Sequence, residues 1–421
     1  CRRLKFTTTV DGYALKGHVI KNISVKAAIH LHSHCKNLCI MEDTCVSINI
    51  GLLKGRFLCQ LSNSDHIKHL GDLENEEGFT YRGREGSNPL NNTMSACHTS
   101  PCLNGGTCQP GITVMDYTCV CQSGFTGKGC EKGFNAVFTN LDRTGRTGPK
   151  SLDNHYAGQD HDGQVSLSRG IQLWTVPYSG HYRIEAIGAA GGYNEQHDGI
   201  YAEYRGRGAR ISGTFVLING EIIQILVGQE GGKSERTSSG GGGSFVVKET
   251  NNCLVIAGGG GGVIDPQSRH AGCDASANTT GNPGYRSWSG GSNGHGSQTV
   301  DDCKAGGGGG GFYSDGRSGL EYGGVLGNGS EGGKAFLNGG KGGRAAMPIM
   351  FGGFGGGGGG THYKGGAGGG GGYSGGSSGA GVSDSCGGGG GSFNSGRDQR
   401  NDCCYNSDGH GQVTVTLLKG N

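Results

Sequence analysis

The chain has 421 residues, of which 94 are glycine and only 33% are hydrophobic. This composition excludes one large conventional core, so we expect two or three domains with apolar burial concentrated in a few segments. The formal net charge of +2 arises from interspersed positive and negative residues. Without a field of one sign, neither nucleic acid nor an anionic membrane is an implied partner.

Seventeen cysteines in modular clusters indicate an oxidising compartment and disulfide frameworks. We therefore predict a secreted, extracellular chain or an ectodomain. No apolar run reaches the roughly 18–20 residues that cross a bilayer, and the longest apolar stretch, residues 214–228, is interrupted by polar side chains. No signal-peptide pattern is present, so we expect the chain that opens on Cys1 to be already processed or trimmed.

Residues 1–90 have the composition of an ordinary globular domain. Strands are predicted at residues 5–10 and 45–50, with a short helix at residues 33–41 between them. On this helix Cys35 and Cys39 are four residues apart and therefore share one face. That arrangement can staple a helix to two neighbouring strands, which predicts a small α+β module.

This cysteine pattern resembles the PAN or apple module over residues 1–90. The resemblance implies that Cys35 pairs with Cys59 and that Cys39 pairs with Cys45. Cys1 is then left without its usual late partner, and the total number of cysteines is odd. An odd cysteine in a secreted protein indicates either an intermolecular disulfide, here through Cys1, or a partner upstream of this numbering.

Three histidines alternate just before the predicted helix. In an extended segment His30, His32 and His34 would lie on one face and could ligate a metal ion. If the helix begins at Ser33, the alternation is lost and the histidines are solvated surface residues. We favour the second interpretation and expect neither a metal nor a cofactor.

Residues 91–133 contain the most specific short signal. An Asn-Gly-Gly turn at 104–106 and a Gly-Phe-Thr-Gly turn at 124–127 lie among six closely spaced cysteines: Cys97, Cys102, Cys108, Cys119, Cys121 and Cys130. This pattern is similar to an EGF-like module. The resemblance implies three pairs: Cys97 with Cys108, Cys102 with Cys119, and Cys121 with Cys130. Because so short a module cannot bury an adequate core, these bridges carry its stability.

Short motifs also mark candidate modifications. The acidic residues that give some EGF-like modules a calcium site are missing before Cys97, so no calcium is expected. Thr107 and Thr126 stand where the family's O-fucose and O-GlcNAc motifs place sugars. Sequons for N-glycosylation, which fit a secretory route, occur at Asn22, Asn91, Asn278 and Asn328.

The region from residue 134 to residue 421 is dominated by glycine, with nearly pure runs at 258–262, 306–311 and 355–360. Glycine in a helix or strand interior costs roughly 0.5–1 kcal/mol per residue relative to alanine, so these runs are not ordinary secondary structure. They are either flexible linkers or helices of the polyproline II type, which must pack side by side to satisfy their backbone groups. Collagen is excluded because no Gly-X-Y period is present.

Two features favour order over a flexible linker. Flexible linkers usually dilute glycine with serine, whereas these runs are nearly pure and flanked by hydrophobic residues, as at 254–257, Phe351 and Phe354. Crosslinks would also have little to hold in a random coil. Six cysteines that we expect to form disulfides punctuate the region: Cys253, Cys273, Cys303, Cys386, Cys403 and Cys404.

Several segments of this region have strand patterns. Tyr182, Ile184 and Ala186 alternate with polar residues, which indicates a half-buried strand. Residues 222–227 form an apolar run typical of a fully buried strand, and alternating apolar residues at 413–417 close the chain. The pattern predicts an antiparallel sandwich with the glycine runs inserted between its strands.

Five glycine-containing motifs, at residues 170–177, 188–192, 225–229, 352–355 and 409–411, resemble the glycine-rich extracellular region of the anaplastic lymphoma kinase and leukocyte tyrosine kinase receptors. The resemblance implies a tumour-necrosis-factor-like β-sandwich, a jelly roll, with an inserted bundle of polyglycine II helices. It also implies a region that binds small cytokine-like ligands and drives receptor dimerisation.

The order of modules departs from those receptors. Their EGF-like module follows the glycine-rich region, whereas here it precedes that region, and a PAN-like module replaces their other N-terminal domains. No membrane span or kinase follows within residues 1–421. We therefore expect this chain to share the fold of the receptors' glycine-rich region more than their receptor function.

One string echoes an enzyme motif. Residues 228–234 match the spacing of a phosphate-binding loop, and a predicted strand precedes them. The following residues are polar and glycine-rich, so no helix is expected to aim N–H groups at a phosphate. We predict a protein that is not an enzyme.

The leading functional hypothesis is a secreted structural or adhesive protein. It would self-associate through its PAN and EGF modules, as a homo-oligomer in a matrix or filament, on a rigid glycine-rich scaffold; partners are other copies and other extracellular proteins or glycans. The alternative is a ligand-binding ectodomain or soluble relative of the kinase receptors. A carbohydrate-binding role for the PAN-like module is a third hypothesis.

Overall fold

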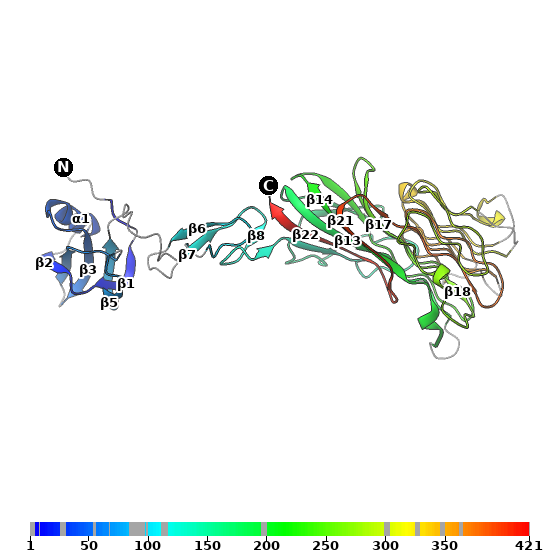
Figure 1. Cartoon of the computed structure of the whole chain (residues 1–421), viewed down its shortest axis with the longest axis horizontal. Coiled ribbons are helices and arrows are strands. Elements are labelled where there is room, and N and C mark those ends of the chain that lie inside the picture. The colour runs from blue at the N-terminus through cyan, green and yellow to red at the C-terminus, as the bar shows by residue number, and fades with distance from the viewer. Residues whose placement is uncertain are drawn as a thin grey trace. The chain divides into compact units, whose positions relative to one another are not determined.

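The computed structural model describes residues 5–7, 9–25, 31–53, 56–66, 68–83, 97, 100–110, 117–194, 200–298, 304–324, 329–345, 350–361 and 365–420. The chain divides into two compact units, Cys1–Lys132 and Gly133–Asn421, each built mostly from β-strands (Figure 1). Five residues of the sequence analysis lie outside the described part, and the expectations for them stay predictions: Cys1, His30, Asn91, Cys303 and Asn328.

The first unit contains a five-stranded antiparallel sheet in the order β1-β5-β3-β4-β2. Its elements are β1 (Val10–Leu15), β2 (Val19–Val25), α1 (Leu31–Met41), β3 (Ser47–Leu53), β4 (Arg56–Ser62), the 3-10 turn η1 (Leu70–Asp72) and β5 (Leu73–Gly83). Helix α1 packs on β3 and β4 (Figure 1). Its buried Cys35 and Cys39 contact the apolar side chains of Ile48, Ile50 and Leu61 on these strands.

The strand predicted at residues 5–10 is wrong, because β1 begins only at Val10. The residues before it cross the end of β5, where the Thr7 N–H donates to the Gly83 carbonyl at 2.9 Å. Phe6 packs against the apolar cluster that α1 covers. The helix predicted at 33–41 is confirmed and begins slightly earlier, at Leu31.

The remainder of the first unit consists of two short strand pairs. Strand β6 (Thr107–Pro110) pairs with β7 (Tyr117–Val120) and places Cys108 opposite Cys119. Strand β8 (Phe125–Thr126) pairs with β9 (Lys132–Gly133). Between residues 97 and 133 the described part of the chain buries only Phe125 and Cys130 fully, so disulfides rather than a hydrophobic core hold this segment.

The second unit contains two antiparallel sheets with the strand orders β10-β22-β13-β14-β21 and β11-β12-β15-β16-β17-β20. The first sheet consists of β10 (Asn135–Phe138), β13 (Gly180–Ile187), β14 (Gly208–Leu217), β21 (Arg397–Asn406) and β22 (Gln412–Gly420). The second consists of β11 (Val165–Ser168), β12 (Ile171–Thr175), β15 (Ile222–Leu226), β16 (Ser244–Lys248), β17 (Cys253–Ala257) and β20 (Phe393–Asn394). Smaller elements are β18 (Val263–Ile264), β19 (Ser385–Cys386), η3 (Ile200–Tyr204), η4 (Ala271–Cys273), η5 (Leu320–Tyr322) and η6 (Phe336–Asn338).

The two sheets pack face to face, as contacts of β13 and β14 with β17 indicate. Alternate residues of β13 are buried, as its sequence predicts, and they pair with apolar residues of the closing strand: Tyr182 lies opposite Leu417 and Ile184 opposite Val415. The ring of Trp174 on β12 lies 6.0 Å from the ring of Tyr182. This aromatic contact links the sheets across the core.

The second sheet is also covered on its other face. There Phe245 of β16 and Leu226 of β15 pack with three buried phenylalanines from the glycine-rich segments, Phe312, Phe336 and Phe354. The rings of Phe312 and Phe336 stack with centroids 5.3 Å apart. Burial on both faces explains why β16 and β17 have continuous apolar runs rather than alternating ones.

The glycine runs form a packed body at one end of the sheets, without strand hydrogen-bond ladders of their own (Figure 1). They continue directly from strands: residues 258–262 follow β17, and residues 387–391 lead toward β20. All residues of these two runs are buried. The runs are therefore parts of a folded body, and the flexible-linker alternative does not describe them.

Within a glycine run, every third N–H group donates to the same neighbouring run. In the run 368–372, the N–H groups of Gly368 and Gly371 donate to residues 238 and 241, at 3.1 and 2.9 Å. Those of Gly369 and Gly372 donate to glycines 307 and 310, at 2.9 and 3.2 Å, and that of Gly370 donates to Gly388 at 2.9 Å. One run thus bonds three neighbouring runs in turn, which satisfies its buried backbone donors.

No side chain fits between the runs. A Cβ atom built on Gly259 would lie 2.4 Å from the carbonyl oxygen of Gly241 and 2.6 Å from that of Gly242. A Cβ on Gly371 would lie 2.0 Å from the carbonyl oxygen of Gly355. These obstacles are backbone atoms of hydrogen-bonded neighbours, so they cannot move aside without breaking the packing.

We predict that Gly259→Ala destabilises the second unit by about 3 kcal/mol or more, because the methyl group displaces two hydrogen-bonded runs. Gly158→Ala is the matched control: Gly158 has φ +73°, but a Cβ atom added there would meet nothing within 4 Å, so only a backbone cost of about 1–2 kcal/mol is expected. Chemical denaturation of both variants measures the difference. Equal losses would contradict a close-packed bundle.

Candidate functional site

Disulfides fix the two modules of the first unit. The structure pairs Cys35 with Cys59 and Cys39 with Cys45, and so ties α1 to β4 and to the segment before β3. In the following segment it forms the pairs Cys97–Cys108, Cys102–Cys119 and Cys121–Cys130. These are the same pairs that the PAN and EGF resemblances imply.

The candidate glycosylation residues that the structure describes are exposed. Asn22 lies on β2, an edge strand of the first sheet, where a glycan would also shield the open edge. Asn278 is exposed in the second unit. Thr107 on β6 and Thr126 on β8 are exposed as well.

The two described histidines of the alternating set lie on α1. His32 and His34 are both exposed there, and two positions on a helix are about 200° apart, so their rings do not face one another. In the described ranges, no group of three or more His, Cys, Asp or Glu side chains could hold a metal ion.

The string at 228–234 is built into the glycine body. The Gly231 N–H donates to the Ala190 carbonyl at 3.2 Å, and the Gly232 N–H donates to that of Phe351 at 2.9 Å. Lys233 Nζ lies 3.1 Å from the Tyr193 hydroxyl. These backbone donors are occupied, and the next residues form no helix, so the string lacks the geometry of a phosphate-binding loop.

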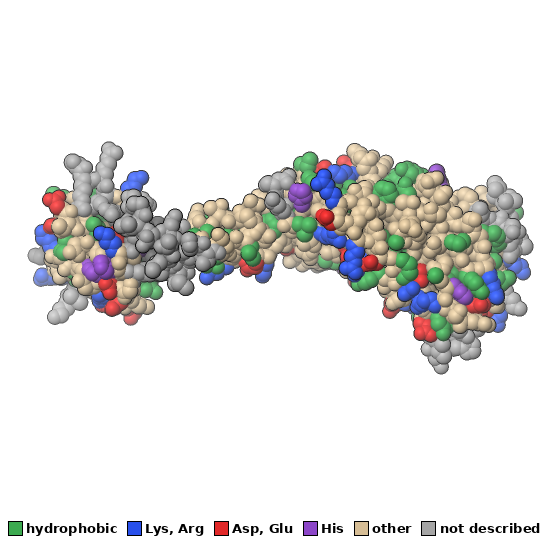
Figure 2. Space-filling model, viewed as in Figure 1, with side chains coloured by type: hydrophobic (Ala, Val, Ile, Leu, Met, Phe, Trp, Pro, Cys, Tyr) green, Lys and Arg blue, Asp and Glu red, His purple; other side chains and the backbone are tan. Residues whose placement is uncertain are grey.

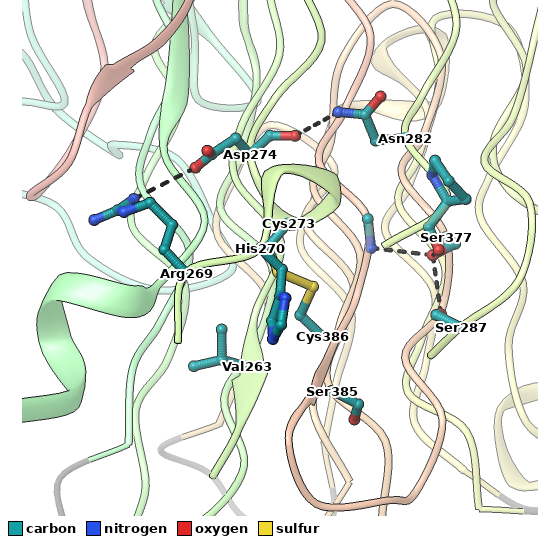
Figure 3. The surroundings of a disulfide bond; sticks show 12 residues. Val263, Arg269, His270, Cys273, Asp274, Asn282, Ser287, Ser377, Ser385 and Cys386 are labelled. Atoms are coloured by element: carbon teal, nitrogen blue, oxygen red, sulfur yellow. Dashed lines mark hydrogen bonds and ion pairs between the residues drawn. A yellow bond between two sulfur atoms is a disulfide. The ribbon is translucent and has the colours of Figure 1, made fainter. Parts of the chain in front are cut away.

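One long-range disulfide crosslinks the glycine-rich segments (Figure 3). Cys273 and Cys386, separated by 113 residues, join η4 to β19. They pack with Val263 and the ring of Tyr285. A bridge across so long a loop restricts the unfolded chain strongly, by roughly 4–5 kcal/mol in the chain-entropy model.

A buried carboxylate lies next to this disulfide. Asp274 is almost completely buried and accepts hydrogen bonds from Arg207 Nε at 3.1 Å and Arg207 Nη2 at 2.8 Å. Arg269 lies 3.7 Å from the same carboxylate, and the Asn282 side-chain amide donates to the Asp274 carbonyl at 2.7 Å (Figure 3). Loss of either arginine partner would leave a poorly compensated buried charge.

His270 connects the same region to the turn before β19. Its ring stacks on that of Tyr285 with centroids 3.6 Å apart, and its Nε2 lies 3.2 Å from Asp384 Oδ1. Burial alone would raise the pKa of Asp384, but hydrogen bonds from the Gln267 N–H and from His270 hold that pKa below its usual value. The carboxylate therefore stays charged where it holds the two segments together.

A second buried carboxylate, that of Glu331, holds the glycine body to the loop after β10. Arg344 Nε donates to Glu331 Oε2 at 2.7 Å, and Arg146 Nη2 donates to it at 3.2 Å. Burial would raise the pKa of Glu331, yet the hydrogen bonds from Arg344 and the charge of Arg146 lower it. The hydrogen-bonded ion pair of Arg146 with Glu331 thus holds the loop after β10 against the glycine body.

Strand β21 forms one edge of the first sheet and contains Cys403 and Cys404, which are bonded to each other. The register with β14 shifts here: Arg210 lies opposite Asp402, but Gly208 lies opposite Asn406. The two cysteines and the next residue thus form a bulge, in which Cys404 has φ +66°. The side chain of Cys403 is exposed on this bulge.

The prediction that Cys253 forms a disulfide is wrong for the described part of the chain, where Cys253 is a free thiol. It begins β17 and packs against the apolar cluster of Phe245 and Phe312, near Tyr373 and Phe393. Every other cysteine that the structure describes is paired within its own unit. Burial raises the pKa of this thiol to about 12.

We predict that Cys253 in the native protein resists alkylation at neutral pH and becomes reactive after denaturation without reductant. The cause is burial, which keeps the thiol protonated and therefore a poor nucleophile. Peptide mapping by mass spectrometry, with different alkylating labels before and after denaturation, measures this. Rapid native labelling of Cys253, or a peptide linked through it, would contradict the assignment.

A histidine is buried among aromatic rings behind β10. The ring of His161 lies 4.2 Å from the ring of Tyr156 and 4.8 Å from that of Phe138, centroid to centroid. Its side chain is fully buried, and neither ring nitrogen has a hydrogen-bond partner in the described structure. Burial lowers the pKa of His161, although Asp160 and Asp162 act in the opposite direction. The sequence did not single out this residue.

The buried ring predicts that acid weakens the second unit. Below about pH 6.5 the unfolded chain binds a proton at His161, while the folded chain, with its lower pKa, binds it only at a lower pH. The free energy of unfolding should therefore fall as the pH drops below that value, by at most about 1.4 kcal/mol per pH unit from this residue.

Comparison of His161→Phe with the native chain, unfolded at pH 7.5 and pH 5.5, isolates this contribution, because phenylalanine cannot bind a proton. His155→Phe is the matched control, since His155 is a partly exposed histidine of the same loop. A pH dependence that is unchanged in His161→Phe would contradict the assignment.

Charged side chains of opposite sign are intermixed on the face of the second unit shown in Figure 2. Arg210, for example, lies 3.0 Å from Asp402 and 3.8 Å from Glu185. A shallow cavity of about 430 Å³ opens at the start of β11; its lining includes Gln164, Ser166, Thr175 and Asn219. These features suit a protein contact better than capture of a strongly charged ligand.

Comparison with known proteins defines the class of one module first. The EGF-like domain family model matches residues 97–129, so this segment is an EGF-like module. Rat versican core protein (Rattus norvegicus) is 51% identical to the chain over 39 residues, which are 9% of this chain and 1% of that protein. Mouse protein crumbs homolog 1 (Mus musculus) is 41% identical over 46 residues, which are 11% of this chain and 3% of that protein.

A further similarity is to a particular receptor. The chain is 39% identical over 100 residues to the mouse leukocyte tyrosine kinase receptor (Mus musculus), which is 23% of this chain and 11% of the receptor. The chain thus spans only a small part of the length of the relatives it matches. The described ranges contain no helix long and apolar enough to cross a membrane. Together with the disulfides, these similarities fit an extracellular protein or ectodomain.

Proposed function

We propose that this chain is a non-enzymatic, secreted structural or adhesive protein whose glycine-rich unit is a rigid body. In this proposal residues 1–90 are a PAN/apple-like domain, residues 91–133 the EGF-like domain, and residues 134–421 the rigid glycine-rich domain. The first two domains make contacts with other copies or with other extracellular proteins or glycans. The observation that carries the proposal is the interlocked packing of the buried glycine runs.

The PAN/apple-like assignment is supported by the arrangement of α1 over a five-stranded antiparallel sheet. Two disulfides, from Cys35 and Cys39 on one face of the helix, staple it there. The tumour-necrosis-factor-like assignment of the second unit is supported by its two face-to-face antiparallel sheets and by the partial similarity to the leukocyte tyrosine kinase receptor.

We assign the glycine runs as polyglycine II helices. Such a helix has three residues per turn and no internal hydrogen bonds, so successive N–H groups point to three different neighbours. The run 368–372 has this pattern, and so does the run 306–311: Gly306 and Gly309 donate to residues 379 and 376, at 3.0 and 2.9 Å. Gly307 and Gly310 donate to glycines 359 and 356, at 2.9 and 2.8 Å.

This packing supports a mechanical role. Each run is fixed by bonds in several directions, and the phenylalanines anchor the whole body to the second sheet. Bending such a body requires the loss of many buried hydrogen bonds at once, and each buried donor left unsatisfied costs about 1–3 kcal/mol. A stiff body is what a matrix or adhesive protein needs in order to hold its contact modules at a fixed spacing.

The native full-length chain provides the test. Hydrogen exchange followed by mass spectrometry should show slow exchange of the amides at 368–372, because they are buried and bonded. The largely exposed glycine turn at 104–106 is the internal control and should exchange fast. Fast exchange of the amides in the runs would show that the glycine body is not rigid, and would contradict the proposal.

Self-association has its own measurement. Non-reducing electrophoresis and electron microscopy of native material should reveal oligomers, and a disulfide-linked species that is lost in Cys1→Ser would identify Cys1 as the intermolecular bridge. A chain that remains strictly monomeric, with a rigid glycine body, would favour the alternative function.

That alternative is a ligand-binding ectodomain or a soluble relative of the kinase receptors, which the partial receptor similarity favours. The resemblance implies a small cytokine-like ligand. Affinity capture of secreted proteins on the immobilised chain, followed by measured binding of one purified small protein, would support it. Transcripts that continue from residue 421 into a membrane span and a kinase would support it independently.

A further inference from the structure

The two sheets of the second unit have four edge strands: β10, β21, β11 and β20. An unprotected edge presents N–H and C=O groups that can pair with another chain, so folded proteins usually block such edges. Strand β21 is blocked by charged residues, among them Arg400 and Asp402, and by the bulge at Cys403 and Cys404. Strand β20 is only two residues long.

Strand β10 is blocked by a neighbouring loop. Asp160 Oδ2 accepts the Asn135 N–H at 2.8 Å, and the Tyr156 hydroxyl accepts the Thr139 N–H at 3.3 Å. The same loop buries His161 against Phe138. The N–H group at the start of β10 and the N–H group just after its end are therefore occupied by this loop.

Strand β11 has none of these protections. Its sequence Val-Ser-Leu-Ser is uncharged, and its register with β12 is regular from Val165 opposite Trp174 to Ser168 opposite Ile171. Among the described strands only β12 pairs with it. The turn after it, Arg169–Gly170, has positive φ at both residues, +52° and +87°, as a tight type I′ hairpin requires.

The ladder fixes which groups of β11 face outward. The Thr175 N–H donates to the Gln164 carbonyl at 3.0 Å, so Gln164, and by alternation Ser166 and Ser168, are bonded to β12. The N–H and C=O groups of Val165 and Leu167 therefore point to the open edge. Their side chains are half-buried, whereas Ser166 and Ser168 are exposed.

We propose that a second copy of this chain pairs with β11 through its own β11, antiparallel, about a two-fold axis at Ser166. In this register Val165 lies opposite Leu167 of the second copy, which makes a hydrogen-bonded pair on each side of the axis. The N–H and C=O groups of Val165 and Leu167, which β12 leaves unbonded, are the four groups per copy that this symmetry needs. The second sheets of both copies then join into one continuous sheet.

The charges flanking β11 are complementary in the same register. Gly163 lies opposite Arg169 of the second copy, so that guanidinium approaches Asp160 and Asp162. All three charged side chains are exposed. The carboxylates of Asp160 and Asp162 accept backbone N–H groups from Asn135 and Gly158, and Arg169 forms no ion pair with any described residue. The shallow cavity lined by residues 163–166 offers space for an incoming side chain.

The contact is small, because β11 has four residues. It falls below the roughly 1,200 Å² of a stable interface, so we expect a weak, concentration-dependent dimer. Its effect would grow where other contacts hold copies close together. The proposed function places contacts on the first unit; this inference adds a separate one on the second, and the two can fail independently.

Sedimentation velocity of the full-length chain, from about 1 to about 500 µM, tests the proposal in this range of weak affinities. The native chain should shift from monomer to dimer. Ser166→Lys should abolish the shift, because it brings two ammonium groups together at the axis. Arg169→Asp and Asp162→Arg should each weaken the dimer about tenfold, through like-charge repulsion.

The double variant Arg169→Asp with Asp162→Arg is the matched control, since it exchanges the two charges and should restore most of the dimer. All these side chains are exposed, and unchanged thermal unfolding confirms that each variant folds. A dimer that Ser166→Lys leaves intact overturns this proposal but not self-association through the first unit. A native chain that is monomeric at all concentrations overturns both.

Discussion

Hydrogen bonds between backbones that lack side chains are the interaction on which the second unit depends. Most folded domains satisfy buried backbone groups within helices or sheets and use side chains to fill the space between them. Here the backbones of separate runs contact each other directly: Gly259 donates to Gly371, and Gly390 donates to Gly259, both at 2.8 Å. The polar chain itself becomes the packed interior, and hydrophobic burial serves chiefly to attach this interior to the sheets.

That attachment combines three kinds of interaction. Phe312, Phe336 and Phe354 supply apolar contact with the second sheet, since aromatic rings bury much area per residue. Glu331 and Asp274, each buried and bonded to arginines, fix loops at the periphery. The bridge from Cys273 to Cys386 restricts the unfolded chain. Phe312 and Cys386 stand directly at the ends of the glycine runs 306–311 and 387–391, because the close packing within a run leaves no room for a side chain.

The sequence predicted those parts of the fold that depend on local patterns. The face shared by Cys35 and Cys39 follows from helical spacing, and the strand at 222–226 follows from its largely apolar sequence. By contrast, the free thiol of Cys253 could not be predicted, because pairing depends on which distant segments meet. The burial of His161 and the open edge of β11 also depend on the order of strands in the sheets, which alternation alone does not reveal.

The position of β22 affects how the chain can fold. This strand is among the last residues described, yet it lies in the sheet between β10 and β13. Both neighbours can therefore complete their pairing only after β22 has been synthesised. During synthesis the first sheet cannot close until β22 has left the ribosome, and contacts of such long sequence separation form slowly. A partly folded chain that is rich in glycine and poor in apolar residues exposes little hydrophobic surface, so a topology that closes late carries a small risk of aggregation.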